Sequence, residues 1–337
     1  MDTPQEAPGL VWPPPLVPIG IETPEPRPVI TAAKMPMLQA ALTVLRGVLR
    51  PYLPVSVRKI HYELLNLCPL FNADDPTRHY SNTRSDYQNL SDLLTRARVC
   101  GLLPWPWITD DTRPCLVWVR WATVHAFVED KRQAFLQGYH RNLLQSQPDH
   151  VEIVCEKNTV HNIIVPVAMA YGVTVMSGRG FADIGSVRDI AERYRASKKA
   201  RLILVALTDH DPEGEQIVQT VGGILWRDFG VTPRHLEISK VAITAEQVRL
   251  LDLPPDMDAK MSSSNYAKFA ARYGTAAFEL EALAPQMQQD LLRHALDSVL
   301  TLSAFEAEQA RERTEQARLA QLRARLGPLL QRELSAL

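Results

Sequence analysis

The chain has 337 residues and a formal net charge of −1, and this length allows two domains that each bury a core of their own. The near-neutral charge excludes a uniformly basic protein, and no apolar run approaches the roughly 20 residues that a membrane-spanning helix needs. We therefore expect a soluble, cytoplasmic protein that has no membrane partner.

Basic and acidic side chains are unevenly distributed along the chain. Residues 34–145 hold 14 basic and 9 acidic side chains, whereas residues 146–257 hold 12 basic and 15 acidic ones. A positive segment followed by a negative one is the pattern expected when one module meets an anionic polymer and the next gathers cations.

The first 33 residues are rich in proline and hold 9 of the 25 prolines. Because residues 1–33 contain one basic side chain and no apolar core segment, we predict a disordered or polyproline arm there, and not a signal peptide. The four cysteines are spaced too widely for a thiolate zinc site, and we expect reduced core thiols at Cys68, Cys100, Cys115 and Cys155.

The next predicted module covers residues 34–146 and is mostly helical. Apolar side chains at helical spacing predict three helices, over Met37–Leu49, Ser56–Asn66 and 85–101. The following stretch, LLPWPWITDDTRPCLVWVRW, is aromatic and β-branched around a turn sequence, which predicts a hairpin. Three helices and a hairpin make a winged-helix DNA-binding module, and a long helix from about Thr123 to Leu144 should lead out of it.

Strand and helix patterns alternate through residues 147–257. Strands are predicted over Val151–Cys155, Val173–Met176, Leu202–Leu207 and Glu237–Ile243, with helices between them over Thr159–Tyr171, Ile184–Arg195 and Gly214–Phe229. This alternation predicts an α/β fold, with a mostly parallel sheet and helices on both faces. Residues 258–337 should form a helical C-terminal extension, whose tail from Ser303 either serves association or is merely solvated.

Carboxylates follow two of the predicted strands. The stretch LILVALTDHDPEGEQI places Asp209 and Asp211 directly after a buried strand, and VEIVCEKN places Glu156 after the first strand. Open α/β sheets bind ligands at the carboxyl ends of their strands, so the three side chains should surround one crevice.

This set of carboxylates predicts a magnesium site. Mg²⁺ binds through a few carboxylates and several waters, which leaves positions for phosphate oxygens and suits phosphoryl transfer. We therefore name Glu156, Asp209 and Asp211 as candidate ligands. The simpler alternative is a turn with a helix N-cap, but a cap needs only one aspartate.

Glu156 and the sequence DHDPEG resemble the Toprim domain that topoisomerases, some primases and certain nucleases share. VRKIHYELL resembles the helix of the topoisomerase VI A subunit and its meiotic relatives in which an arginine precedes the DNA-cleaving tyrosine by four positions, and Arg58 and Tyr62 match that spacing. GLLPWPWITDDTR and YAKFAARYGTAAFELEAL look like the short, stand-alone Mini-A homologues of bacteria and phages. The resemblance covers about 56–300, and it departs from the usual pattern at His61, where a second tyrosine often stands.

The resemblance implies a magnesium-dependent, DNA-cleaving transesterase of the topoisomerase type, an isomerase in which Tyr62 attacks a backbone phosphate of double-stranded DNA. Arg58 lies one helical turn from Tyr62, where its charge would favour the phenolate and its planar fork could bind the phosphate. Lys59 and Arg179 are further candidate DNA contacts.

The same resemblance implies a homodimer in which each active site takes Tyr62 from one subunit and the carboxylates from the other. The chain contains no glycine-rich, phosphate-binding loop followed by a lysine, so a possible ATPase subunit would be a separate chain.

Two alternatives stay open. A Toprim nuclease would keep the metal-binding carboxylates but use water as its nucleophile, which would make Tyr62 dispensable. A non-catalytic DNA-binding protein would need neither, and the intact set of three carboxylates argues against it.

Overall fold

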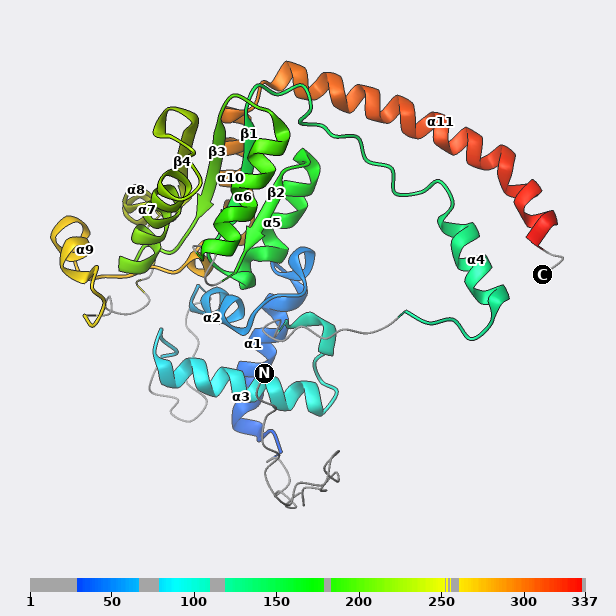
Figure 1. Ribbon diagram of the computed structural model, residues 1–337. Coiled ribbons are helices and arrows are strands. Elements are labelled where there is room, and N and C mark those ends of the chain that lie inside the picture. Colours follow the sequence, from blue (N-terminus) through cyan, green and yellow to red (C-terminus); the bar gives the residue numbers. More distant parts are fainter. Residues whose placement is uncertain are drawn as a thin grey trace, which may run out of the picture.

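The computed structural model describes residues 29–66, 79–109, 119–178, 183–251, 253, 255 and 261–334. Within these residues the chain forms a parallel four-stranded sheet flanked by helices, a helical N-terminal module below it, and one long helix that projects from the body (Figure 1). The predicted α/β class is thus confirmed. Almost all of the predicted arm and Arg179 lie outside the described residues. No helix in the described part combines the length and apolarity needed to cross a bilayer.

The N-terminal module is built from three helices, α1 (Met35–Arg46), α2 (Val57–Leu65) and α3 (Arg84–Val99), with short 3₁₀ turns η1 (Ala32–Lys34) and η2 (Arg50–Tyr52). Hydroxyl side chains cap the N-termini of α2 and α3. Ser56 accepts a hydrogen bond from the Lys59 amide, and Thr83 accepts one from the Asp86 amide. The helices share one apolar core, which includes Leu38, Leu45, Leu49, Ile60, Leu64, Leu90 and Leu94.

The predicted hairpin is not seen in the described part of its segment. Residues Trp105–Trp107 form a 3₁₀ turn, η3, and Ile108 makes an isolated bridge with Val55. Two prolines flank and interrupt this tryptophan pair, and proline removes the amide that a strand ladder needs. The rest of the predicted hairpin, residues 110–118, lies outside the described residues.

The predicted long helix after this segment is wrong in its length. Helix α4 covers only Val124–Ala134, and the chain then runs without regular structure to the first strand. Leu136 and Gly138 both have positive φ angles, which no α-helix accommodates. Because α4 buries none of its residues, no core holds further turns in place.

The sheet contains β1 (His150–Cys155), β2 (Thr174–Ser177), β3 (Leu202–Leu207) and β4 (Leu236–Ala242) in the order β2-β1-β3-β4, with every pair parallel. All six residues of β3 are buried, as expected for a central strand covered on both faces. From β1 the chain adds β2 toward one edge of the sheet, and it then returns to place β3 on the opposite flank of β1. The topological switch point therefore lies between the ends of β1 and β3.

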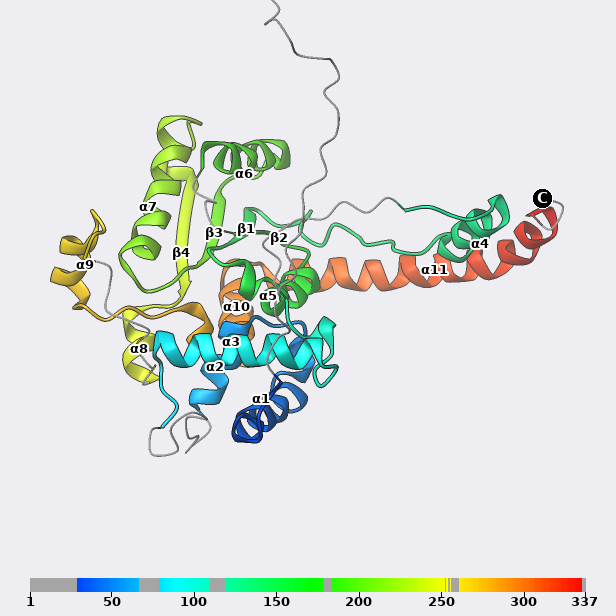
Figure 2. The ribbon, with the colours of Figure 1, turned by 90° about the horizontal axis from the view of Figure 1, so that it is seen from below.

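Helices cover both faces of the sheet (Figure 2). On one face lie α6 (Ile184–Ser197) and α7 (Pro212–Arg227), and on the other lie α5 (Asn158–Tyr171) and α10 (Pro285–Val299). Alternate strand residues serve the two faces, so Val205 packs against α5 and α10 whereas Leu204 packs against α6 and α7.

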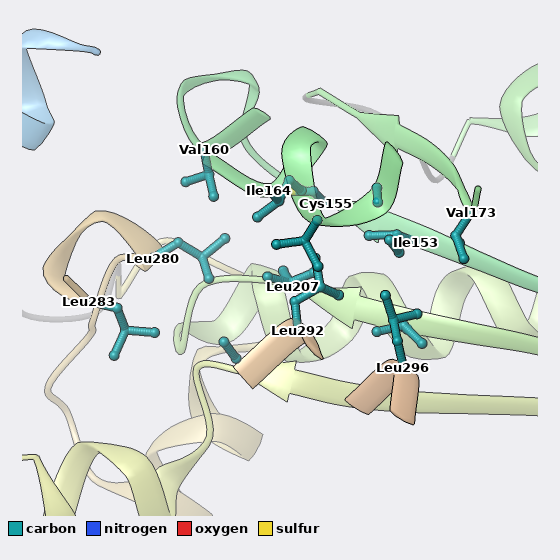
Figure 3. Close-up of a cluster of buried hydrophobic side chains, with 14 of the residues drawn as sticks. Ile153, Cys155, Val160, Ile164, Val173, Leu207, Leu280, Leu283, Leu292 and Leu296 are labelled. Atoms are coloured by element: carbon teal, nitrogen blue, oxygen red, sulfur yellow. The ribbon is translucent and has the colours of Figure 1, made fainter. Parts of the chain in front are cut away.

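The C-terminal extension completes this core and is not a separate unit. Figure 3 shows Leu280, Leu283, Leu292 and Leu296 packed with side chains of β1, β3 and α5. Between β4 and α10 lie α8 (Ala245–Leu250), α9 (Tyr266–Tyr273) and the 3₁₀ turn η5 (Leu280–Ala282), and η4 (Pro233–His235) precedes β4. The predicted helix through FELEAL is thus wrong beyond Gly274, where the backbone takes a positive φ and α9 ends.

The last helix, α11 (Leu302–Leu334), leaves the body and carries α4 near its far end (Figures 1 and 2). Ion pairs from Arg141 to Glu308 and Glu315 hold the extended segment after α4 against α11. The predicted helical tail is confirmed, because α11 is a continuous helix. Of the cysteines in the described part, Cys155 is buried as predicted, but Cys100 is exposed just after α3.

Candidate functional site

Two of the predicted carboxylates meet at the switch point of the sheet. Glu156 follows β1 and Asp209 lies two residues after β3, and a Glu156 carboxylate oxygen accepts a hydrogen bond from the Asp209 amide at 3.1 Å. The strands are neighbours in register, with Cys155 opposite Leu207, so their ends cannot lie far apart. The ends of the two strands thus bring Glu156 and Asp209 together.

Asp209 is almost fully buried and bonds in three directions. One carboxylate oxygen accepts a hydrogen bond from the Leu280 amide at 2.8 Å, and the other lies 2.9 Å from the Lys157 ammonium group. The Asp209 carbonyl oxygen accepts a hydrogen bond from Lys240 at 2.8 Å. Asp209 therefore joins β3, β4, η5 and the end of β1.

Asp211 has the capping role that we weighed as the simpler alternative. Its carboxylate accepts a hydrogen bond from the Gly214 amide at 2.6 Å and begins α7. Burial raises the pKa of Glu156, and the charge of Asp211 adds to this effect.

Gly214 lets α7 approach the site closely. A Cβ atom at this position would overlap the Asp209 carbonyl oxygen and lie 3.0 Å from its carbonyl carbon, both rigid backbone atoms. Only glycine fits without moving Asp209 or the first turn of α7.

We expect Gly214→Ala to lower the free energy of unfolding by about 3 kcal/mol, the upper part of the range for overpacked sites. Chemical denaturation followed by circular dichroism measures the change. Gly223→Ala is the matched control in the same helix, because its new Cβ would meet only the flexible Arg227 side chain. That variant should gain stability from the higher helix propensity of alanine. Equal stability of the two variants would contradict the steric argument.

Lys157 is the cation at the centre of the crevice. Its ammonium group lies 2.9 Å from Asp209, 2.9 Å from Glu281 and 3.2 Å from Glu279, measured to the nearest carboxylate oxygen of each. Burial alone would lower the pKa of Lys157, but Glu281, Asp209 and Glu279 together raise it above its ordinary value. The Lys157 side chain therefore stays charged.

A second ion pair flanks the crevice on the β4 side. Lys240 lies 2.6 Å from Glu215 of α7, and His210 lies 3.1 Å from the same carboxylate oxygen. Burial would raise the pKa of Glu215, but its hydrogen bond with His210 and the charge of Lys240 lower it to about 2. His210 thus turns to Glu215 and to the rings of Phe269 and Tyr273.

The predicted nucleophile and its arginine face this crevice from α2. The Arg58 guanidinium binds the Glu279 carboxylate through two contacts, Nε to Oε2 at 2.8 Å and Nη2 to Oε1 at 3.1 Å. The Tyr62 hydroxyl group donates a longer hydrogen bond, of 3.4 Å, to Oε2 of the same residue. Because Lys157 also contacts Glu279, α2 and the crevice are connected within a single chain. Tyr62 itself is 1% exposed.

The prediction of a DNA contact at Lys59 does not fit its place in the fold. The Lys59 side chain is buried, and its ammonium group donates hydrogen bonds to the carbonyl oxygens of Glu281 and Leu283 and pairs with Glu63. A helix presents successive residues to different sides, so Arg58 faces Glu279 while Lys59 anchors α2 on η5.

Two carboxylates at the strand ends have raised pKa values. Burial raises the pKa of Asp209 to about 8, and it also raises the pKa of Glu156. Each carboxylate adds to the effect, since Glu156 raises the pKa of Asp209 and Asp211 raises that of Glu156. A divalent cation would relieve this repulsion. In the described part of the chain, however, no group of three or more histidine, cysteine, aspartate or glutamate side chains is placed so that it could hold a metal ion.

Glu279 and Glu281 were not among the predicted site residues. Their stretch, AFELEAL, alternates acidic and apolar residues, but we interpreted it as part of a helix. Two glutamates inside an apolar run are a signal for buried charges that need partners, because isolated carboxylates are rarely buried. Both lie at η5 and pair with Lys157.

Comparisons of the chain with protein-family models, with curated proteins and with solved structures find no match in any of the three.

Proposed function

We propose that this chain is a magnesium-dependent, DNA-cleaving transesterase similar to the topoisomerase VI A subunit, with a winged-helix-like N-terminal module and a Toprim-like sheet domain. The observation that carries the proposal is the chain of contacts from Tyr62 through Glu279 and Lys157 to Asp209. These contacts connect Tyr62, which has an arginine one helical turn away, with the carboxylates at the topological switch point of the sheet.

Glu156, Asp209 and Asp211 supply only carboxylate oxygens, the kind of ligand that the hard cation Mg²⁺ prefers. In this structure those oxygens bond to the Asp209, Gly214 and Leu280 amides and to Lys157, so the three side chains would have to turn toward a bound ion. These three residues would hold the ion. When bound, it would supply stabilisation of the negative charge that develops on the phosphate oxygens.

The chain's own residues would position the nucleophile. In the proposed reaction the Arg58 guanidinium binds the scissile phosphate in bidentate fashion and holds it beside the Tyr62 oxygen. The Tyr62 oxygen forms a bond to phosphorus while the bond from phosphorus to one deoxyribose oxygen breaks. The phenol loses its proton and the leaving oxygen gains one, so the step exchanges one phosphodiester for another and consumes no water.

Cleavage of both strands of double-stranded DNA requires two such sites, and we propose that a homodimer supplies them. Strand passage driven by ATP would need a separate ATPase subunit. DNA would approach the N-terminal module, where Arg46, Arg50 and Arg84 are exposed at the surface.

The burial of Tyr62 favours a second candidate function, a metal-dependent nuclease that uses water. Tyr62 is 1% exposed and its hydroxyl group bonds Glu279, so it cannot reach a phosphate until Glu279 moves away. A nuclease would need no such motion at Tyr62, because its nucleophile is water.

One experiment separates the two functions. The protein is incubated with supercoiled plasmid and Mg²⁺, and the reaction is stopped with denaturant before the DNA is analysed with and without protease digestion. Cut ends that carry covalently attached protein support the transesterase. Cut ends without protein support the nuclease.

We also expect the DNA affinity to fall steeply with salt. If the N-terminal module contacts about four phosphates, the affinity should drop roughly a hundredfold between about 50 and 200 mM salt, because each neutralised phosphate releases counterions. Fluorescence anisotropy with a labelled duplex in EDTA measures this slope without cleavage. A flat dependence would instead indicate that the N-terminal module docks a protein.

A further inference from the structure

The Glu279 carboxylate is held by three donors that come from two parts of the fold. Arg58 and Tyr62 reach it from α2, and Lys157 reaches it from the end of β1. Arg58 contacts both carboxylate oxygens, which is the paired geometry that guanidinium groups use for carboxylates and phosphates alike. These donors therefore form an anion-binding site, and a glutamate of the chain itself occupies it.

Each donor has another contact that holds it without Glu279. Arg58 lies over the Tyr87 ring at 4.8 Å, and Lys157 keeps Asp209 and Glu281 as neighbours. Tyr62 is packed into the interior of its module through its ring. If Glu279 withdrew, two cations and a hydroxyl group would remain in place around the vacated position, so the site is preorganised for a replacement anion.

Withdrawal of Glu279 needs only a rotation of its side chain. The backbone on both sides is fixed, because Phe278 pairs with His210 and the Leu280 amide donates a hydrogen bond to Asp209. The Glu279 side chain is 18% exposed, and those of Arg58 and Lys157 are 24% and 15% exposed. Solvent therefore reaches part of each of these side chains, whereas Tyr62 is buried.

We propose that Arg58, Lys157 and Tyr62 form a binding site for a backbone phosphate of DNA, and that Glu279 occupies this site in the free protein as a built-in competitor. The inference rests on the proposed function, because it assumes that DNA is the substrate. A phosphodiester carries one negative charge and two unesterified oxygens, so it can replace a carboxylate without changing the charge of the site. The exchange brings phosphorus beside the Tyr62 oxygen, and Glu279 thereby limits reaction to a DNA segment that displaces it.

The test compares Glu279→Gln with wild type by binding of a short, labelled DNA duplex in EDTA, where no cleavage occurs. The variant keeps the shape of the side chain and removes its charge, so we expect about tenfold tighter binding, as for the loss of one charge-assisted contact. Glu246→Gln is the matched control, because it removes the same charge from an exposed position on α8. In Arg58→Gln/Glu279→Gln the gain should disappear.

Binding by Glu279→Gln that is no tighter than binding by Glu246→Gln would overturn the competitor role. Glu279→Asp, which keeps the charge but withdraws it by one methylene, decides the same question if the glutamine variant does not fold. The plasmid assay keeps the two proposals apart. Protein-linked DNA from wild type with unchanged affinity in Glu279→Gln would refute only the competitor, whereas tighter binding without protein-linked DNA would refute only the transesterase.

Discussion

Tyr62→Phe should form no protein-linked DNA, with cleavage at least about a thousandfold below wild type, because the change removes the only oxygen that we assign as nucleophile. The ring stays packed in α2, and the lost hydrogen bond to Glu279 is long, at 3.4 Å. We therefore expect the variant to fold and to keep most of its DNA affinity, because Arg58 and Lys157, the charged groups of the phosphate site, are unchanged. Gel analysis after denaturation, together with anisotropy for binding, measures the two effects separately.

Tyr87→Phe is the control for this change. Tyr87 contributes its ring to the contact with Arg58, and the ring face is retained in phenylalanine. The control should cleave DNA at close to the wild-type rate. If Tyr62→Phe cleaves as fast as the control and releases ends free of protein, water is the nucleophile and the transesterase assignment is wrong.

Asp209→Asn should reduce magnesium-dependent cleavage at least about a hundredfold, because it replaces a charged oxygen ligand by a neutral amide. Asparagine retains an oxygen that can accept the hydrogen bond from Leu280, so most of the local packing should survive. Cleavage at several Mg²⁺ concentrations measures the loss. Asp228→Asn, at the C-terminal end of α7 and away from the crevice, makes the same chemical change as a control. Full activity in Asp209→Asn would refute the metal assignment of this residue.

A mixture of Tyr62→Phe and Asp209→Asn shows which subunit completes each site. In the single chain Tyr62 is connected to Asp209 through Glu279 and Lys157, so we expect a site assembled within one subunit and an inactive mixture. If Tyr62 instead works with the carboxylates of the other subunit, a mixed dimer keeps one intact site. That dimer would nick plasmid DNA, and nicking by the mixture would contradict assembly within one subunit.

Sequence patterns predicted the sheet domain well because its signals are local and strong. The apolar run 202–207 is β3 with the same bounds, and the alternation around it gave every strand of the sheet. Predictions were wrong where tertiary contacts decide the structure. The segment after Ala134 leaves the helix to run along α11, where Arg141 meets Glu308, and that partner lies far away in sequence.

Only the residues of the candidate site that directly follow strands could be predicted from the sequence. Glu156 and Asp209 follow strands, and the topology of parallel sheets brings strand ends together. The rest of the site depends on the distant η5, which places Glu279 and Glu281 against Lys157. Nothing in the local sequence of α2 distinguishes the partly exposed Arg58 from the buried Lys59, because that difference arises only when η5 docks on the helix.

The projecting helix α11 also affects how the molecule moves in solution. A compact body of this length would have a radius of gyration of roughly 20 Å, whereas a helix of 33 residues is about 50 Å long. The molecule is thus elongated, because α11 extends from the compact body and α4 lies near its far end (Figure 2). Rotation about the axis of α11 meets less hydrodynamic drag than end-over-end rotation, so the molecule should tumble anisotropically.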